Sequence, residues 1–373
     1  MENRIKSVGE QARALGGTRL LMAIASIVII IWGVNQAQSV LALVLVAVFL
    51  AILAASPVVW LKEKGFPGAL AVLIVVAAMV VALLLIGVVV GTSVSGFSDS
   101  LPLYQSRIRE HLLTIKTMLA GLGITVTDKA LLQYANPGTI MTLTTSLVSG
   151  LGSVVSNVVL ILLTVTFILI EASSFPAKLR AILADPQRTF AQYSRFVEDI
   201  KSYTIIKTLI SLAAGVLVGI WLYILGVDFP ILWGFLAFLL HYVPNVGFLF
   251  AAVPAVLYAL VQLGVGAAAL TASGYVVISF ILGNIVEPRF MGRRLGLSTL
   301  VVFLSLVFWG SVLGPVGLIL CVPLTMTLKF ACESSESTHW LYVLLTPENS
   351  REPAPREPQT GSVVGAEAPS QPA

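Results

Sequence analysis

Long apolar runs constrain this chain more than any other feature of its sequence. The segment from about residue 69 to 94 is almost entirely apolar, and other segments also exceed the roughly 20 apolar residues that a helix needs to cross a bilayer. Hydrophobic residues make up 57% of the 373 positions and charged residues only 11%, whereas soluble domains carry about 25% charged residues. The sequence therefore predicts an all-α, polytopic integral membrane protein.

The basic residues lie in short segments beside the apolar runs. In such segments lysine and arginine favour the cytoplasmic side of the membrane, so the net charge of +4 does not indicate binding of nucleic acid. Lys62 and Lys64, for example, separate the second and third predicted spans. This distribution predicts that both chain termini are cytoplasmic. Cys321 and Cys332 lie in or beside an apolar segment and do not indicate a disulfide framework.

Changes in composition divide the chain into six segments. Residues 96–145 mix both charge signs with apolar residues at helical spacing, which predicts an amphipathic helical insertion, either a solvated connector or a functional lid. The chain from Thr346 is rich in Pro, Glu, Ser and Gln, which is typical of disorder. The predicted organisation is a cytoplasmic N-terminal segment (1–19), three transmembrane helices (20–95), an amphipathic extracytoplasmic insertion (96–149), a fourth span with a cytoplasmic helix (150–202), a hydrophobic core region (203–335) and a disordered cytoplasmic tail (336–373).

Two apolar hairpins within this core region are interrupted by helix-breaking residues. In residues 230–263 the break is His241-Tyr-Val-Pro-Asn-Val-Gly, followed by Pro254. In residues 299–328 it is Gly314-Pro-Val-Gly, followed by Pro323. Paired segments broken by Gly and Pro in corresponding positions point to the substrate site of a transporter. Such hairpins are re-entrant or fully spanning; the alternative is that Gly and Pro only kink ordinary transmembrane helices.

A charged run at 284–294 lies between the two hairpins. Ionisable residues at membrane depth are costly and mark functional sites. Glu287 would bind a cation, carry a proton, or form a salt bridge with a neighbouring arginine. Asn284, one helical turn earlier, would face the same cavity, and Pro288 limits helical continuation at the carboxylate. The basic residues of the run are interpreted as topology determinants: Arg289, Arg293 and Arg294.

The residues around both breaks resemble a known family. The segment 232–247 with the following Val-Pro-Ala, and the segment 284–298 with the later Phe-Trp-Gly and Gly-Pro-Val-Gly, are similar to the signatures of the AI-2E (autoinducer-2 exporter) family. The resemblance covers roughly residues 15–335 and implies a transporter of the bacterial inner membrane. It further implies export of a small quorum-sensing signal or, in some members, sodium/proton antiport. Position 241 is His where similar sequences often carry Asn, so it is either a titratable group in the path or a neutral hydrogen-bonding residue.

These observations predict a secondary transporter or exporter of a small polar solute, with residues 203–335 as its transport core. A sodium (cation)/proton antiporter is the alternative, and a non-transporting membrane scaffold is a third. No nucleotide-binding, metalloprotease or serine-hydrolase motif is present, so no enzyme activity, cofactor or metal site is expected. The expected partners are the lipid bilayer and a small polar solute or a cation (H⁺ or Na⁺). Three small-residue pairs have the spacing that lets helices approach closely, either inside the protein or at the interface of an expected homo-oligomer: Gly87/Gly91, Gly215/Gly219 and Gly310/Gly314. The residues expected along the path are His241, Pro244, Asn245, Gly247, Asn284, Glu287, Pro315 and Gly317.

Overall fold

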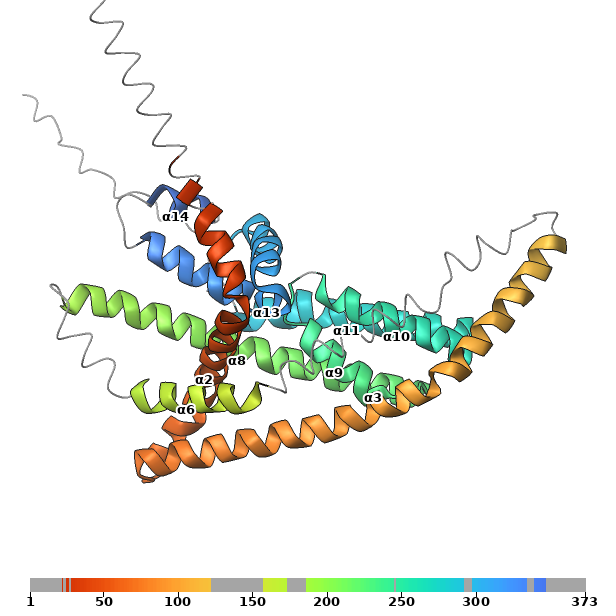
Figure 1. Cartoon of the computed structure of the whole chain (residues 1–373), viewed down its shortest axis with the longest axis horizontal. Coiled ribbons are helices and arrows are strands. Elements are labelled where there is room, and N and C mark those ends of the chain that lie inside the picture. Colours follow the sequence, from red (N-terminus) through yellow and green to blue (C-terminus); the bar gives the residue numbers. More distant parts are fainter. Residues whose placement is uncertain are drawn as a thin grey trace, which may run out of the picture.

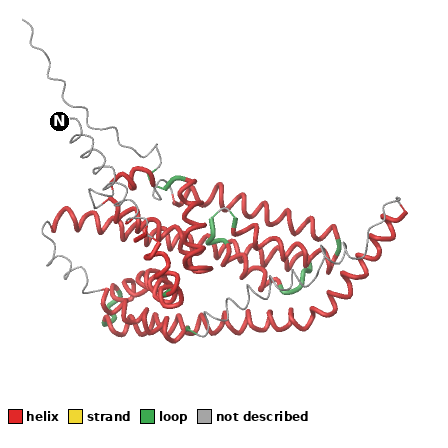
Figure 2. The backbone as a smooth tube through the Cα atoms, turned by 45° about the horizontal axis from the view of Figure 1, so that its top comes forward, coloured by secondary structure: helices red, strands yellow, loops and turns green. Residues whose placement is uncertain are grey.

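The computed structural model describes residues 22, 25–26, 28–121, 157–172, 186–244, 246–291, 297–333 and 339–346. Helices make up almost all of this part of the chain, and it contains no strand (Figure 2). The all-α prediction is therefore confirmed. The elements in chain order are α2 (Gln38–Glu63), α3 (Gly68–Gly121), α6 (Val158–Ala172), α8 (Pro186–Leu225), α9 (Pro230–Leu240), α10 (Gly247–Leu263), α11 (Val265–Phe280), the π-helix η1 (Ile281–Val286), α12 (Glu287–Met291), α13 (Thr299–Glu333) and α14 (His339–Leu345).

Within the described residues, five helices are long and apolar enough to cross a membrane, which confirms the polytopic membrane prediction. Between 11% and 33% of the most apolar stretch of each span is buried inside the protein. Most of the apolar surface therefore faces outward, as it does in helices whose solvent is lipid. The spans are Gln38–Glu63, Gly68–Phe97, Tyr193–Leu225, Val265–Phe290 and Thr299–Glu333.

Helices α2, α3 and α6 form one packing unit beside the core region. Ala47, Ala51 and Ala54 recur at helical spacing on α2 and are buried. They belong to the same cluster as Ala71 of α3 and Val165 of α6. Small side chains on α2 let the two neighbouring helices approach closely. In Figure 1, α2 crosses the other helices steeply, so this unit also reaches α8 and α13.

Helix α3 does not end at the membrane boundary. Its apolar span is Gly68–Phe97, but the helix continues without interruption to Gly121. A helix of 54 residues is about 80 Å long, against a hydrocarbon thickness of about 30 Å. The first part of the predicted insertion is therefore a direct extension of the third span, and Figure 1 shows it leaving the bundle. The rest of the insertion, 122–149, lies outside the described residues, as does the N-terminal segment 1–19.

The first hairpin consists of two short helices. Helix α9 has 11 residues and is about 16 Å long, too short to cross the hydrocarbon layer alone. The chain then turns at 241–246 and continues as α10. Gly215 of α8 and Gly234 of α9 face each other, and a Cβ on either would lie 2.6–2.7 Å from the carbonyl oxygen of the other. These glycines therefore allow α8 and α9 to pack backbone to backbone.

The second hairpin lies within α13. The helix is broken at Gly314, whose φ of 63° and ψ of −145° are not helical, and it restarts at Pro315, a favourable first residue for a helix. Pro254 in α10 and Pro323 in α13 lie inside continuous helices. The prediction that each hairpin is interrupted again at its second proline is therefore wrong. A single proline removes one hydrogen bond, and the surrounding packing can offset that loss.

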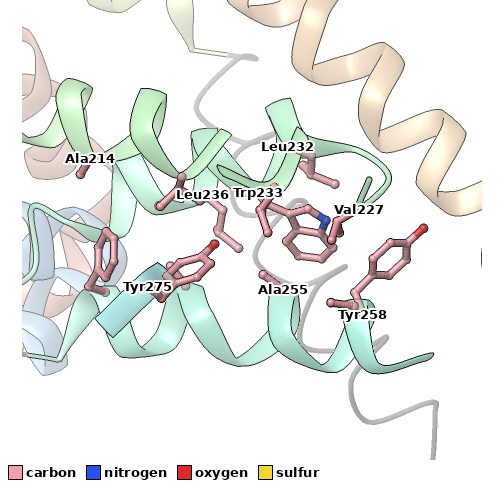
Figure 3. Close-up of a cluster of buried hydrophobic side chains, with 14 of the residues drawn as sticks. Ala214, Val227, Leu232, Trp233, Leu236, Ala255, Tyr258 and Tyr275 are labelled. Carbon is pink, nitrogen blue, oxygen red and sulfur yellow. The ribbon is translucent and has the colours of Figure 1, made fainter. Parts of the chain in front are cut away.

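A hydrophobic cluster joins α8, α9, α10 and α11 around the first hairpin. Trp233 and Leu236 reach from α9 toward Ala255 of α10 (Figure 3). Trp233 is 1% exposed, and its indole N–H donates to the backbone carbonyl of Asp228 at 3.1 Å. This cluster fixes the arms of the hairpin relative to the spans on either side.

Part of the predicted cytoplasmic tail is helical. Within residues 336–373, the apolar segment His339–Leu345 forms α14, which lies against α13. The Lys329 ammonium lies over the ring of Tyr342, 5.2 Å from its centroid. Residues from 347 onward lie outside the described part of the chain.

Candidate functional site

A stripe of polar residues runs along one buried face of α8. Thr204, Lys207 and Ser211 are spaced by three and four positions, so they lie on the same side of the helix. Their exposed fractions are 0%, 3% and 0%. Two of these side chains, those of Thr204 and Ser211, have no hydrogen-bond partner among the described residues. A membrane span with this arrangement presents polar groups to the interior of the protein rather than to lipid.

Lys207 forms an ion pair with Glu287. Its ammonium nitrogen lies 2.8 Å from the carboxylate oxygen Oε1, and the two side chains are 4% and 25% exposed. Lys207 lies within the span Tyr193–Leu225 and Glu287 within the span Val265–Phe290. Charges in membrane spans are rare, pair with one another and occur at functional positions. The pair therefore connects two different spans, whereas the Lys201–Glu198 pair lies within one helix.

A π-helix precedes Glu287 directly. In η1 the hydrogen bonds join residues five apart, and the N–H of Glu287 accordingly donates to the carbonyl oxygen of Leu282. Pro288 follows, and its ring would collide with the carbonyl oxygen four residues earlier in an α-helix. The wider π turn gives that ring room. The helix therefore continues through Pro288 to Met291, contrary to the expectation that it stops at the carboxylate.

The π turn also separates Glu287 from Asn284. In an α-helix residues three apart share a face, which is why Asn284 was expected to face the same cavity. In the structure Asn284 is exposed, whereas Glu287 reaches Lys207. Asn284 is therefore directed away from the ion pair.

The break of the first hairpin lies beside the ion pair. His241 is 7% exposed. Its ring contacts Phe248 edge-on at 5.4 Å, and its Nε2 has no hydrogen-bond partner within the described chain. Next to it, the hydroxyl of Tyr242 donates to Thr208 Oγ1 of α8 at 2.8 Å. The break thus contributes two polar side chains to the region around Lys207.

The second hairpin closes the same region from another side. Cys321 and Val322 of α13 share a hydrophobic cluster with Tyr203 of α8 and Val243 of the first break. Tyr203 lies one helical turn before Lys207 on α8, so this cluster lies next to the ion pair. Both hairpins and both charged spans therefore meet around the ion pair. This meeting point, defined by Tyr203, Lys207, His241, Glu287 and Cys321, is called the charge-pair site below.

The glycines expected along the path have a packing role. A Cβ on Gly247 would collide with the carbonyl oxygen of Leu240, and a Cβ on Gly317 would collide with that of Trp309. Each glycine therefore allows the second arm of its hairpin to start close to the end of the first. Pro244 is partly buried in the first break, and Pro315 is exposed after the second.

The arginines of the charged run do not join the charge-pair site in the described part of the chain. Arg289 is exposed, in line with a role at the membrane surface. Arg293, Arg294 and Asn245 lie outside the described residues. The residue that sequence reasoning missed is Lys207. Its signal was a single lysine within the apolar stretch 203–226 at the start of the predicted core region.

The family of this chain follows from its comparison with known proteins. The family model described as AI-2E family transporter matches residues 20–336. The chain belongs to this family. The AI-2E match includes α2 to α13 and therefore both hairpins and the charge-pair site.

Curated relatives of this AI-2E family chain are similar over most of their length. The "putative transport protein YhhT" of Escherichia coli is 38% identical over 331 residues, which cover 89% of this chain and 95% of the relative. The "AI-2 transport protein TqsA" of the same organism is 37% identical over 335 residues, covering 90% and 97%. A "putative transport protein" of Haemophilus influenzae is 36% identical over 327 residues, covering 86% and 94%. The family is described as a transporter family and these relatives are named as transport proteins or putative transport proteins, which agrees with the predicted transport class.

Proposed function

We propose that this chain is a secondary transporter that exports a small polar solute across the bacterial inner membrane, past the charge-pair site. The observation that carries the proposal is the Lys207–Glu287 pair, which joins two membrane spans at the point where both broken hairpins meet. A buried ion pair contributes little to stability compared with apolar packing. Its presence in a span is better explained by a role in the transport cycle.

The region around the pair suits a hydroxylated solute. Thr204 and Ser211 place hydroxyl groups one helical turn on either side of Lys207, and His241 adds a ring nitrogen. Buried hydroxyl and imidazole groups that lack a protein partner are costly and are satisfied when a polar ligand enters. The relative named "AI-2 transport protein TqsA" supplies the first solute to test, autoinducer-2.

The test measures movement of autoinducer-2 into inverted membrane vesicles that contain the protein. Glu287→Gln and the double variant Lys207→Met/Glu287→Gln are both expected to lose the flux. The double variant matters because it removes both charges and leaves no buried ammonium without a partner, so its loss cannot be attributed to unfolding. Glu198→Gln serves as the matched control, since Glu198 lies on α8, the helix that carries Lys207, and is exposed. Unchanged flux in the double variant would refute the role of the charge-pair site.

Cation/proton antiport is a second candidate, and the same pair supports it. Carboxylates in membrane spans serve as proton and cation sites, and an ammonium partner competes with such cations for the carboxylate. Sodium-driven dequenching of a pH-sensitive dye in inverted vesicles, with no solute present, distinguishes this activity from solute export. Absence of a sodium response together with autoinducer-2 flux would exclude it.

The proposed orientation places both termini in the cytoplasm, and the proposed assembly is a homo-oligomer. Fusions of alkaline phosphatase and of a fluorescent protein to each terminus test the orientation, because each reporter is active on one side only. The glycine pairs that suggested oligomers divide into two kinds. Gly215 packs against α9 inside the protein, whereas a Cβ on Gly87 or Gly91 would meet nothing within 4 Å. Cross-linking of the purified protein in lipid nanodiscs measures the subunit number directly.

A further inference from the structure

We infer that η1 is a register switch, a turn that changes between π-helical and α-helical hydrogen bonding and so moves Glu287 toward or away from Lys207. The inference rests on the proposed function, because it describes how the charge-pair site opens and closes during transport. It starts from the position of one π-helix immediately before the only carboxylate that pairs with a buried lysine in the described chain. Single π turns inside α-helices occur frequently at functional sites.

The angular positions along α11, η1 and α12 show what the π turn does. Thr271 and Tyr275 are four residues apart on the buried face of α11, with exposed fractions of 0% and 2%. An α-helix rotates by about 100° per residue, so Glu287, twelve positions after Tyr275, would lie about 120° away from that face. A π turn accommodates one additional residue, which leaves eleven effective steps and an offset of only about 20°. The π turn therefore brings Glu287 into line with Tyr275.

Conversion of η1 to an α-helix would reverse this alignment. With α11 held in place by its packing against α8 and α10, the chain after η1 would rotate by about 100°. Glu287 would leave Lys207 and turn toward the side on which Gly283 and Asn284 are exposed. The carboxylate is already 25% exposed and lies three residues before the end of the span Val265–Phe290, so the rotation carries it to the outer side of the helix near the membrane boundary.

The surroundings of η1 permit such a change. A Cβ on Gly283 would meet nothing within 4 Å, and Gly283, Asn284 and Ile285 are all exposed. Only Leu282 is buried within the π segment. Pro288 and the ion pair favour the π form, whereas the α form regains the regular hydrogen-bond ladder. A turn with opposing preferences and an open outer face has the properties of a two-state element.

Deletion of Gly283 separates a switch from a fixed spacer. Removing one residue from η1 leaves an ordinary α-helix in which the original Glu287 still lies eleven steps after Tyr275 and still faces Lys207. Pro288 then lies inside an α-helix, as Pro254 and Pro323 already do. If η1 were only a fixed spacer, the variant that lacks Gly283 would transport as well as the wild type. A switch would be locked, because the additional residue that allows the second register is gone.

The matched control is Gly283→Ala, which keeps the number of residues and adds a methyl group where nothing lies within 4 Å. Both variants are measured as full-length protein for autoinducer-2 flux in inverted vesicles. The deletion is expected to lower the flux by at least about tenfold, while Gly283→Ala retains it. Equal flux in the deletion and in the control would overturn the switch.

Two measurements that do not depend on transport complete the test. Hydrogen exchange of the wild-type protein should be at least about tenfold faster in residues 282–288 than in α11, and the deletion should remove the difference. A short thiol cross-linker should join Lys207→Cys to Glu287→Cys with equal yield with and without the deletion, in a background of Cys321→Ser and Cys332→Ser. Full protection of 282–288 in the wild type would overturn the switch, as would a lost cross-link in a folded deletion variant. If the wild-type protein moves no autoinducer-2 but these two results hold, the proposed solute is wrong and the switch stands.

Discussion

The energetics of the Lys207–Glu287 pair can be measured against a surface pair on the same helix. At 2.8 Å between nitrogen and oxygen, two unit charges attract by about 6 kcal/mol at an effective dielectric constant of 20. Most of this attraction offsets the loss of hydration of the two groups. Removing one partner of a buried pair nevertheless costs about 3–5 kcal/mol, because the other charge remains buried and unpaired.

The variants Glu287→Gln and Lys207→Met should differ in stability because the two side chains differ in exposure. Glu287→Gln leaves Lys207, which is 4% exposed, without its counter-charge, and we expect a loss of about 3–5 kcal/mol in the free energy of unfolding. Lys207→Met leaves a carboxylate that is 25% exposed and therefore less deeply buried than Lys207, so the loss of stability should be smaller. The double variant Lys207→Met/Glu287→Gln should regain most of the stability, since neither charge then remains in the span.

Chemical denaturation in mixed micelles measures these differences. A thiol-reactive fluorophore reports unfolding, because both cysteines, Cys321 and Cys332, are buried and neither forms a disulfide within the described residues. The control cycle uses Lys201 and Glu198, whose nitrogen–oxygen distance is 3.9 Å and whose side chains are 36% and 65% exposed. That pair should contribute less than about 1 kcal/mol. If the coupling energy of the buried pair is no larger than that of the control pair, the reasoning about burial is refuted.

Further predictions concern backbone positions. Gly317→Ala should lower the midpoint of thermal unfolding strongly, since its Cβ would collide with the carbonyl oxygen of Trp309. The control Gly87→Ala should change the midpoint little, because nothing lies within 4 Å of its Cβ. Similar midpoints for the two variants would contradict the close approach of the hairpin arms. Phe229 has φ 57°, a left-handed conformation that costs a side-chain-bearing residue about 1–2 kcal/mol. Phe229→Gly should therefore unfold at a higher temperature than Phe229→Ala, and the reverse order would exclude backbone strain at this position.

The sequence predicted the membrane class and the break in each hairpin for clear physical reasons. Runs of apolar residues and adjacent Gly and Pro act locally, so their effects can be read without knowing the packing. Gly314 is an example: Pro315 follows it, and the helix indeed breaks there. Pro254 and Pro323 are prolines like Pro315, but they lie in continuous helices. Their tolerance depends on neighbouring helices, which a single sequence does not display.

The sequence indicated only one of the two charged residues of the ion pair in the charge-pair site. Glu287 was identified because a carboxylate beside apolar runs is unusual. A neighbouring arginine was the only salt-bridge partner considered for it, because the distance of 80 positions between Lys207 and Glu287 hides their contact. Asn284 was placed on the same face because α-helical periodicity was assumed throughout, and the π turn breaks that periodicity. The sequence carries no periodic signal for one additional residue in a turn.

The continuous helix α3 has a mechanical consequence. The portion after Phe97 extends for 24 further residues to Gly121, a length of about 36 Å. A rigid rod of this length turns a tilt of 5° at the membrane surface into a displacement of about 3 Å at its far end. Phe97 contacts the rings of Phe229, Trp233 and Tyr258 at 5.6–5.9 Å. Small movements of the first hairpin are therefore amplified outside the membrane, and a label near Gly121 would report on motions at membrane depth.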